Sequence, residues 1–353
     1  MAGVFACVGC GAVLTAPLSR VALPDHAHQS YGYGLFPVLM DPGTYAVDPE
    51  PSGPPWRLWD EVGEGEAETR GVFAPVSALS LGAPGAILVS PGDTRGTVLM
   101  LEQCDGGCCG LDGRDGPNLA CEGCGRAVAT RIDDCSRWQA VWLDPKAVHR
   151  LPTDGPETQW IGWEALANDR EGTPPVEPSG VWSPRWAAAV GTALAHLVAA
   201  SAGTAVSVPD GPVADIFRRS LDALLPSGPT AKTAVLAGPG LQAPDPAAAI
   251  VLVPRHPQTG RAWQPSGTAD TVPLAAEVWA YLAFHSEQLL VPASGRLPDG
   301  VLRDDPLPLH PWGPFRPDSG VFRSTLARLP VVRQPWLHRI YDDVSAQPYA
   351  RPF

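Results

Sequence analysis

Short apolar runs separated by turn-forming residues fill the first 150 positions of the chain. Each run is bounded mainly by Gly, Pro or Asp, which is typical of β-strands. The runs lie at Val72–Val76, Ala86–Ser90, Thr97–Leu101 and Gln139–Leu143. Residues 41–71 are instead crowded with Pro, Gly and acidic residues, so we expect a loop there. The pattern predicts a β-rich domain over residues 1–150.

Helical and extended patterns alternate after residue 182. Ser183 and Pro184 provide an N-cap and a favoured first helical residue, and the alanine-rich run that follows stops at Gly203. A second helix is expected after Pro212, where apolar residues recur at helical spacing, and a third from about Leu274 to Leu289. Strands are expected at Ala205–Val208, Thr233–Leu236 and Ala249–Val253.

This alternation predicts an α/β domain over residues 182–353 with some parallel strand pairing. Residues 151–181 carry several Pro and Gly turns and are expected to be a linker. The C-terminal end is punctuated by prolines and is expected to wrap the surface as a tail. The predicted fold class is therefore mixed α+β and α/β, with a β-rich N-terminal domain followed by an α/β domain.

Composition agrees with two domains. The chain has 353 residues, of which 44% are hydrophobic and 18% charged, enough to bury a sizeable core. It also has 41 prolines and 37 glycines, which favour short elements joined by long loops.

Charge and hydropathy argue against two classes of partner. The net charge is −12 and no run of Lys and Arg occurs, whereas binding a phosphate backbone needs a basic face. The apolar start of the chain has no basic residue before Arg20, so it does not match a signal peptide, and no later run is long enough to span a membrane. We therefore expect a cytoplasmic protein without nucleic-acid or membrane partners. Cysteines in that compartment are metal ligands more often than disulfides.

All eight cysteines lie in the first 135 residues, and four of them form a repeat. The segment Ala6-Cys7-Val8-Gly9-Cys10-Gly11 matches Ala120-Cys121-Glu122-Gly123-Cys124-Gly125 at every position except the third. Two cysteines at this spacing can hold one tetrahedral ion from a single tight turn. The glycines allow a turn whose amide N–H groups point at the sulfurs.

Paired knuckles of this form resemble zinc ribbons, and the resemblance covers only the knuckles. It implies a structural Zn²⁺ held by Cys7, Cys10, Cys121 and Cys124. The alternatives are buried free cysteines or a redox Cys-x-x-Cys pair, which usually opens a helix after a strand. The spacings typical of iron–sulfur proteins are absent.

The remaining cysteines allow two arrangements. Cys104, Cys108 or Cys109, and Cys135 can form a second site, completed by His26 or His28. Alternatively, Cys104 and Cys108 pair with Cys121 and Cys124 as a local ribbon, which leaves Cys7 and Cys10 to Cys135 and a histidine. Neighbouring Cys108 and Cys109 do not easily bind the same ion, so one of them is expected to be a spectator.

A site closed by four cysteines has no open coordination position, which favours a structural over a catalytic role. The leading hypothesis is a metal-stabilised binding or scaffolding module for a protein partner. The alternative is an enzyme with its active site in the C-terminal domain or between the domains. The polar residues available to that alternative are His256, Asp304, Asp305, His310 and His338. Ser80 imitates a hydrolase nucleophile motif, but no helix is expected after it.

Overall fold

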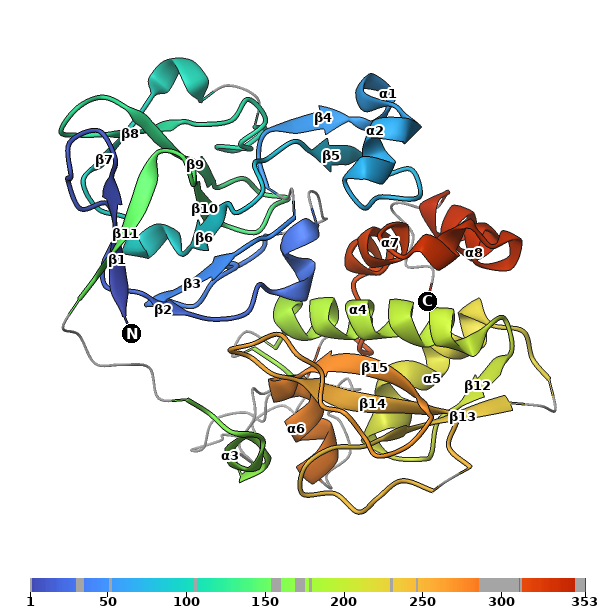
Figure 1. The fold of residues 1–353 in the computed structure, drawn as a ribbon. Helices are drawn as coiled ribbons and strands as arrows, with labels where there is room; N and C mark the ends of the chain where they lie inside the picture. The colour runs from blue at the N-terminus through green and yellow to red at the C-terminus, as the bar shows by residue number, and fades with distance from the viewer. Residues whose placement is uncertain are drawn as a thin grey trace, which may run out of the picture. The chain divides into compact units, whose positions relative to one another are not determined.

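The fold is seen in a computed structural model that describes residues 2–29, 35–50, 53–104, 107–153, 160–168, 175–177, 180–228, 231–245, 247–285, 311, 313–346 and 353. The chain forms two compact units. Unit 1 contains residues 1–161, 257–260 and 327–333, and unit 2 contains the rest. Both helices and sheets are present, which confirms a mixed α and β class (Figure 1).

Unit 1 is built around a seven-stranded sheet. The strand order is β2 (Ser19–Arg20), β3 (Thr44–Val47), β6 (Ile87–Val89), β10 (Ala140–Leu143), β9 (Ala127–Ile132), β8 (Leu119–Cys121) and β7 (Thr97–Leu99). All neighbours pair antiparallel except β2 and β3. A separate antiparallel pair joins β1 (Gly3–Cys7) to β11 (Val148–Pro152).

The core of unit 1 lies between these two sheets. Phe5 of β1 meets Tyr45 of β3 edge to face, with ring centroids 5.1 Å apart. Val141 of β10 and Val148 of β11 are buried in the same cluster. Burying such side chains contributes on the order of 2 kcal/mol each relative to exposure. The apolar cluster therefore holds β1 against the large sheet.

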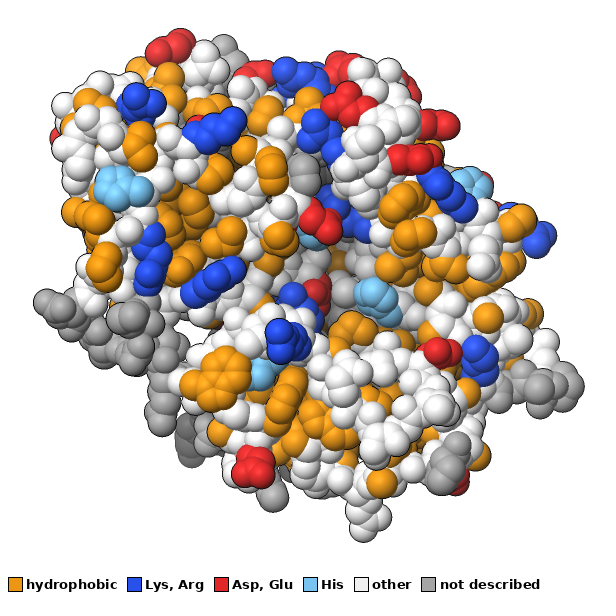
Figure 2. Space-filling view, viewed as in Figure 1, with side chains coloured by type: hydrophobic (Ala, Val, Ile, Leu, Met, Phe, Trp, Pro, Cys, Tyr) orange, Lys and Arg blue, Asp and Glu red, His pale blue; other side chains and the backbone are white. Residues whose placement is uncertain are grey.

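Small elements complete unit 1. Strands β4 (Trp56–Leu58) and β5 (Ala78–Ser80) form a pair, and α1 (Trp59–Val62) and α2 (Glu64–Thr69) are short helices. Short 3₁₀ turns lie at Asp25–His28, Pro91–Asp93, Leu101–Gln103 and Pro330–Arg333. Acidic side chains gather over α1 and α2 in Figure 2. Every acidic residue of this pair of helices is exposed, so the acidic run is a solvated surface.

Unit 2 is built around a four-stranded parallel sheet. Its order is β12 (Ala205–Ser207), β13 (Ala231–Leu236), β14 (Ile250–Arg255) and β15 (Asp270–Ala275). The helices are α3 (Trp163–Asn168), α4 (Pro184–Ser201), α5 (Pro212–Leu224), α6 (Ala276–Phe284), α7 (Ser319–Ala327) and α8 (Pro335–Ser345). Both faces of β14 are covered, because Ile250 to Val253 are all fully buried.

The predicted α4 and α5 are present, and α4 ends where the backbone turns left-handed at Ala202 (φ 53°) and Gly203 (φ 80°). The Ser183 side chain makes no capping hydrogen bond. In the sheet, Gly238 approaches α6 closely: a Cβ there would lie 2.2 Å from the ring of Trp279. Gly238 begins a tight turn after β13, closed by a hydrogen bond from the Leu241 N–H to the Gly238 carbonyl at 3.2 Å.

Several predictions of local structure were wrong. Residues 41–71 are not a loop, since β3, β4, α1 and α2 lie there, and Val72–Val76 is not a strand. The helix expected from Leu274 begins two residues later, because β15 continues to Ala275 in register with β14; its expected end lies outside the described residues.

The expected linker and tail also contain structure. Strand β11 runs to Pro152 and α3 occupies 163–168, both within the predicted linker. The predicted surface tail contains α7 and α8, whose Phe322 and Leu337 side chains are fully buried. Apolar faces on these helices outweigh the prolines, which stand at their margins, as Pro335 does at the start of α8.

Candidate metal centre

The two Cys-x-Gly-Cys-Gly segments fold into the same turn. In the first, the Gly11 N–H donates to the Cys7 carbonyl at 2.9 Å and the Cys7 N–H to the Ala12 carbonyl at 2.9 Å. In the second, Gly125 and Cys121 make the equivalent bonds at 2.8 Å each. Each knuckle thus closes a strand–turn–strand unit, one on β1 and the other between β8 and β9. Local sequence alone accounts for this shape.

Glycine is required at the end of each turn. Gly11 has φ 75° and Gly125 has φ 72°, both in the left-handed region that other residues avoid. The middle glycine serves a different purpose: a Cβ on Gly9 would lie 3.3 Å from the Cys124 sulfur, and one on Gly123 would lie 3.4 Å from the Cys10 sulfur. Each knuckle therefore packs its middle glycine against a sulfur of the other.

The tertiary fold brings four sulfurs together. The Sγ atoms of Cys7 and Cys124 are 3.6 Å apart, as are those of Cys10 and Cys121, and the four Sγ atoms all lie within 4.8 Å of one another. Two sulfurs bound to one tetrahedral zinc at the usual 2.3 Å are about 3.8 Å apart. The donor set is thus close to the size of a four-thiolate zinc site.

Burial and hydrogen bonding suit this donor set to a closed site. Cys7 and Cys121 are fully buried and belong to the core cluster of unit 1, whereas Cys10 and Cys124 lie at the surface. The Gly9 N–H donates to the Cys7 sulfur at 3.3 Å. Such bonds spread thiolate charge and fix the orientation of the ligand.

Two of the four thiols, those of Cys7 and Cys10, have shifted pKa values. Burial raises the pKa of Cys7, but the N–H groups of Gly9 and Cys10 and the neighbouring thiols outweigh it and lower the pKa to about 7. At Cys10, the Ala12 N–H lowers the pKa, but hydrogen bonds with Cys121 and Cys124 outweigh it and raise the pKa to about 11. Cys7 therefore releases its proton more readily than Cys10 does.

Comparisons with protein-family models, curated proteins and solved structures found no match to this chain. The chemistry of this centre is therefore argued from its own residues.

A second group of donors lies elsewhere in unit 1. It contains Cys108, Cys109, Asp134 and Cys135, whose ligand atoms lie within 4.8 Å of one another. The Cys108 sulfur is 3.0 Å from that of Cys135 and 3.4 Å from that of Cys109. Hydrogen bonds with Cys108 and Ser136 lower the pKa of Cys135. Hydrogen bonds of Cys108 with Cys135 and Cys109 raise the pKa of Cys108 to about 12.

This group differs from the sequence expectations. Of Cys108 and Cys109, one was expected to be a spectator, yet the sulfurs of both belong to the group. Cys104 joins neither group, since its thiol donates to the Met100 carbonyl at 3.2 Å. His26 and His28 do not belong to the second group among the described residues. Asp134 was not anticipated, because an aspartate beside a cysteine has no distinctive spacing.

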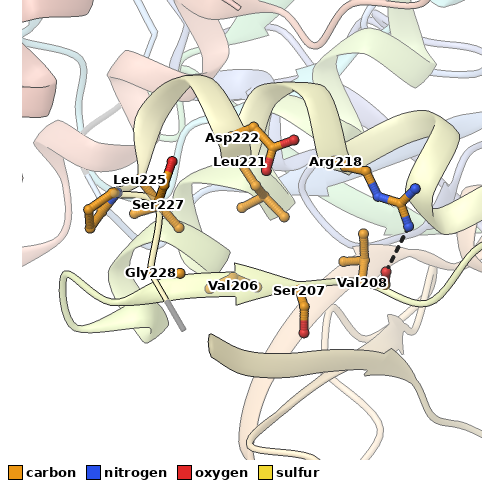
Figure 3. Close-up of a pocket in the computed structure, with 11 residues that line it drawn as sticks. Val206, Ser207, Val208, Arg218, Leu221, Asp222, Leu225, Ser227 and Gly228 are labelled. Carbon is orange, nitrogen blue, oxygen red and sulfur yellow. Dashed lines mark hydrogen bonds between the residues drawn. The ribbon is translucent and has the colours of Figure 1, made fainter. Parts of the chain in front are cut away.

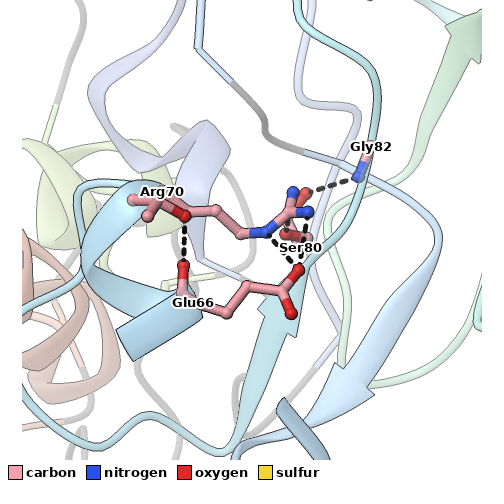
Figure 4. Close-up of polar contacts among 5 residues, drawn as sticks. Glu66, Arg70, Ser80 and Gly82 are labelled. Atoms are coloured by element: carbon pink, nitrogen blue, oxygen red, sulfur yellow. Dashed lines mark hydrogen bonds and ion pairs between the residues drawn. The ribbon is translucent and has the colours of Figure 1, made fainter. Parts of the chain in front are cut away.

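Ser80 has a structural position. It ends β5, and its hydroxyl donates to the Gly53 carbonyl. The same hydroxyl accepts the Gly82 N–H at 3.2 Å (Figure 4). Nearby, Arg70 forms an ion pair with Glu66 at 3.0 Å and hydrogen-bonds the Ser80 carbonyl at 3.5 Å. Among the described residues, no histidine hydrogen-bonds this hydroxyl. The Ser80 side chain stabilises a turn, as serine side chains commonly do.

Among the described residues, none of the histidines considered for catalysis belongs to a cluster of metal ligands. His256 is buried against Trp163, with ring centroids 5.0 Å apart, and His338 faces Asp342 at 3.6 Å on the exposed side of α8. Asp304, Asp305 and His310 lie outside the described residues.

A groove of about 310 Å³ lies between α5 and β12 in unit 2 (Figure 3). Its lining has no histidine. Arg218 at one end is occupied, since it donates to the Val208 carbonyl at 3.1 Å and pairs with Asp210 at 2.6 Å. Asp222 is the one carboxylate in the lining. An enzymatic role for this part of the chain stays a prediction.

No described helix is long and apolar enough to cross a membrane.

Proposed function

We propose that Cys7, Cys10, Cys121 and Cys124 bind one structural Zn²⁺ and that unit 1, stabilised in this way, binds a protein partner. The observation that carries the metal assignment is the convergence of two equivalent knuckles on four sulfurs. All four positions of a tetrahedral ion are then filled by protein, so neither water nor substrate can reach the metal. Zinc would supply folding energy and no chemistry.

Exposed apolar side chains near the knuckles support a protein partner. Val8 is 44% exposed and Val13 47%, both on the first knuckle and the segment after it. On β7 and the turn after it, Val98, Leu99 and Leu101 are 46%, 45% and 76% exposed. We call these five residues the knuckle-edge surface.

Backbone contacts bring the segments that carry these five residues close together. The Glu122 N–H donates to the Gly96 carbonyl at 2.9 Å, which places the start of β7 against the second knuckle. A Cβ on Gly96 would lie 3.1 Å from the Val13 carbonyl oxygen, which places β7 beside the first. Hydrophobic side chains gather over this side of unit 1 in Figure 2.

The proposed occupant is an extended, apolar segment of another protein. Strand β7 ends its sheet, and among the described strands it pairs only with β8. Edge strands are usually guarded by charged residues, because their free backbone groups recruit other strands. An edge that instead exposes Val98 and Leu99 suits the addition of a partner strand.

The metal assignment is tested by Cys7→Ser. Elemental analysis of the wild type should give at least one zinc per chain in a colourless solution. Cys7→Ser should lose one equivalent and unfold unit 1, because structural zinc contributes on the order of 10 kcal/mol in small modules. Cys104→Ser makes the same chemical change outside both groups and should keep the metal and the melting temperature. Full zinc occupancy in Cys7→Ser would refute the assignment.

The partner assignment is tested by site-specific photocrosslinking in the cells that produce the protein. A crosslinker at position 98 should give a discrete adduct with another protein, and a Leu101→Asp substitution in the same chain should abolish it. Position 58 is the matched control, because Leu58 is similarly exposed, at 49%, on β4. Equal adducts at both positions, or an adduct that survives Leu101→Asp, would count against a specific surface. A self-adduct would replace the partner by a second copy of this chain.

A further inference from the structure

The loop that carries Cys108 and Cys109 has a backbone that only glycine permits. A Cβ on Gly107 would lie 2.0 Å from the Gly110 carbonyl oxygen, and one on Gly110 would lie 2.0 Å from the Asp133 carbonyl oxygen. Both distances are far below any van der Waals contact. The two glycines therefore press the loop against itself and against the residues after β9.

Hydrogen bonds then fix this loop opposite Asp134 and Cys135. Leu111 and Asp133 exchange backbone hydrogen bonds of 2.9 and 2.8 Å, and the Cys109 N–H donates to Asp134 Oδ1 at 2.8 Å. Arg131 holds the Asp133 carboxylate at 2.8 Å. The convergence of three thiols and a carboxylate is thus imposed by the backbone.

We propose that Cys108, Cys109, Asp134 and Cys135 form a second metal site, which takes a thiophilic divalent cation of the zinc class and exchanges it with solution. Four donors are present, as a tetrahedral ion needs, and three of them are the soft sulfur ligands that select zinc-class ions over magnesium or calcium. This site is independent of the proposed role of unit 1.

Exchange follows from exposure. Cys108 and Cys109 are exposed and Asp134 and Cys135 are half-buried, whereas two ligands of the knuckle centre are fully buried. Ligand exchange requires an incoming group to reach the ion, and here it can approach from solvent. The ion would therefore leave to a chelator well before the ion of the knuckle centre.

A disulfide between Cys108 and Cys135 is the competing use of these sulfurs. It would employ two thiols and leave the Cys109 thiol unused, whereas the metal site uses all three thiols and the Asp134 carboxylate. The experiment must therefore keep the thiols reduced and report both possibilities.

The test is titration of the fully reduced protein with Zn²⁺ or Co²⁺ while a colorimetric chelator follows release. The wild type should bind two equivalents and release them in two phases, and cobalt should produce sulfur-to-cobalt charge-transfer absorption at both steps. Cys135→Ser should lose the fast phase only, and Asp134→Asn should weaken the fast site by about tenfold or more. Cys104→Ser should change neither phase.

Three outcomes would overturn the proposal. The first is that Cys135→Ser binds as many equivalents as the reduced wild type. The second is a fast phase that persists in Cys135→Ser. The third is mass spectrometry showing that a Cys108–Cys135 disulfide forms in air even when Zn²⁺ is in excess. Because these readouts follow the fast phase, the disulfide, and the difference between the wild type and Cys135→Ser, they remain informative if the knuckle centre binds no metal.

Discussion

At the scale of single residues, the most unusual charged group is Asp48 at the end of β3. It is almost fully buried, one carboxylate oxygen has no hydrogen-bond partner among the described groups, and the other accepts the Glu50 N–H at 3.0 Å. Burial raises the pKa of Asp48 to about 6. The Glu50 N–H and the Arg328 charge act in the opposite direction and lower this pKa, and the Glu50 charge raises it further. Arg328 is itself buried, and that burial lowers its pKa.

The raised pKa predicts a pH-dependent stability. The folded chain binds the Asp48 proton more tightly than the unfolded chain, so this contribution is fully present below about pH 4 and is lost as the pH rises towards 6. Asp48→Asn keeps a neutral side chain at every pH. Its melting temperature minus that of the wild type should therefore rise between pH 4.5 and 6.5 and then level off.

Thermal melts of the two proteins, measured in parallel, check this. Both share the same cysteines, so loss of metal at low pH affects both and cancels in the difference. A difference that stays flat over this range, and falls instead as the pH rises to about 4, would show that the Arg328 contact dominates and that the pKa of Asp48 lies below its ordinary value.

At the scale of elements, periodicity located most of the regular structure of unit 2 and much less of unit 1. The α5 helix has its apolar positions, such as Ile216 and Leu221, on one buried face, so the sequence pattern is sufficient. Strands of two to four residues carry too few positions for a pattern. Strand β3 was missed for this reason, and it exists because Tyr45 and Val47 pair with β6.

At the end of strand β15, a helix was predicted too early, where the chain is still a strand. The apolar residues around Leu274 fit a helix as well as a strand, and pairing with β14 decides for strand up to Ala275. Helix α6 also packs closely against the turn after β13, because Gly238 in that turn lies against the ring of Trp279.

This close packing predicts a sharp sensitivity to one methyl group. Gly238→Ala should destabilise unit 2 by about 2 to 3 kcal/mol, because Trp279 is only 1% exposed and has no room to move. Gly267→Ala is the matched control, since a Cβ there meets nothing within 4 Å. Denaturant unfolding should separate the two variants, and equal stability would mean that Trp279 repacks freely.

At the scale of the whole molecule, all cysteines belong to unit 1, so metal should matter to one unit more than the other. We expect exhaustive chelation under reducing conditions to increase amide exchange at β1, β8 and β9, whose ends carry the knuckles. Strand β14 should keep its protection, since its side chains are buried within unit 2.

Hydrogen-exchange mass spectrometry of the intact chain, with and without chelator, makes this comparison directly. Strand β14 of unit 2 is the internal reference, because all eight cysteines lie in unit 1. Unchanged protection at β1 and β8 after verified removal of zinc would contradict a structural role for the metal.

The sequence by itself determined what depends on neighbours along the chain. The two knuckles, their turn glycines Gly11 and Gly125 and the helices α4 and α5 follow from residue spacing and backbone preference. Tertiary structure alone decided which cysteines meet. Whether Cys121 and Cys124 face Cys7 or Cys104 depends on where β1 lies relative to β8, which is set by strand pairing and core packing between distant segments. Asp134 was hidden for the same reason: its proximity to Cys108 exists only once Leu111 pairs with Asp133.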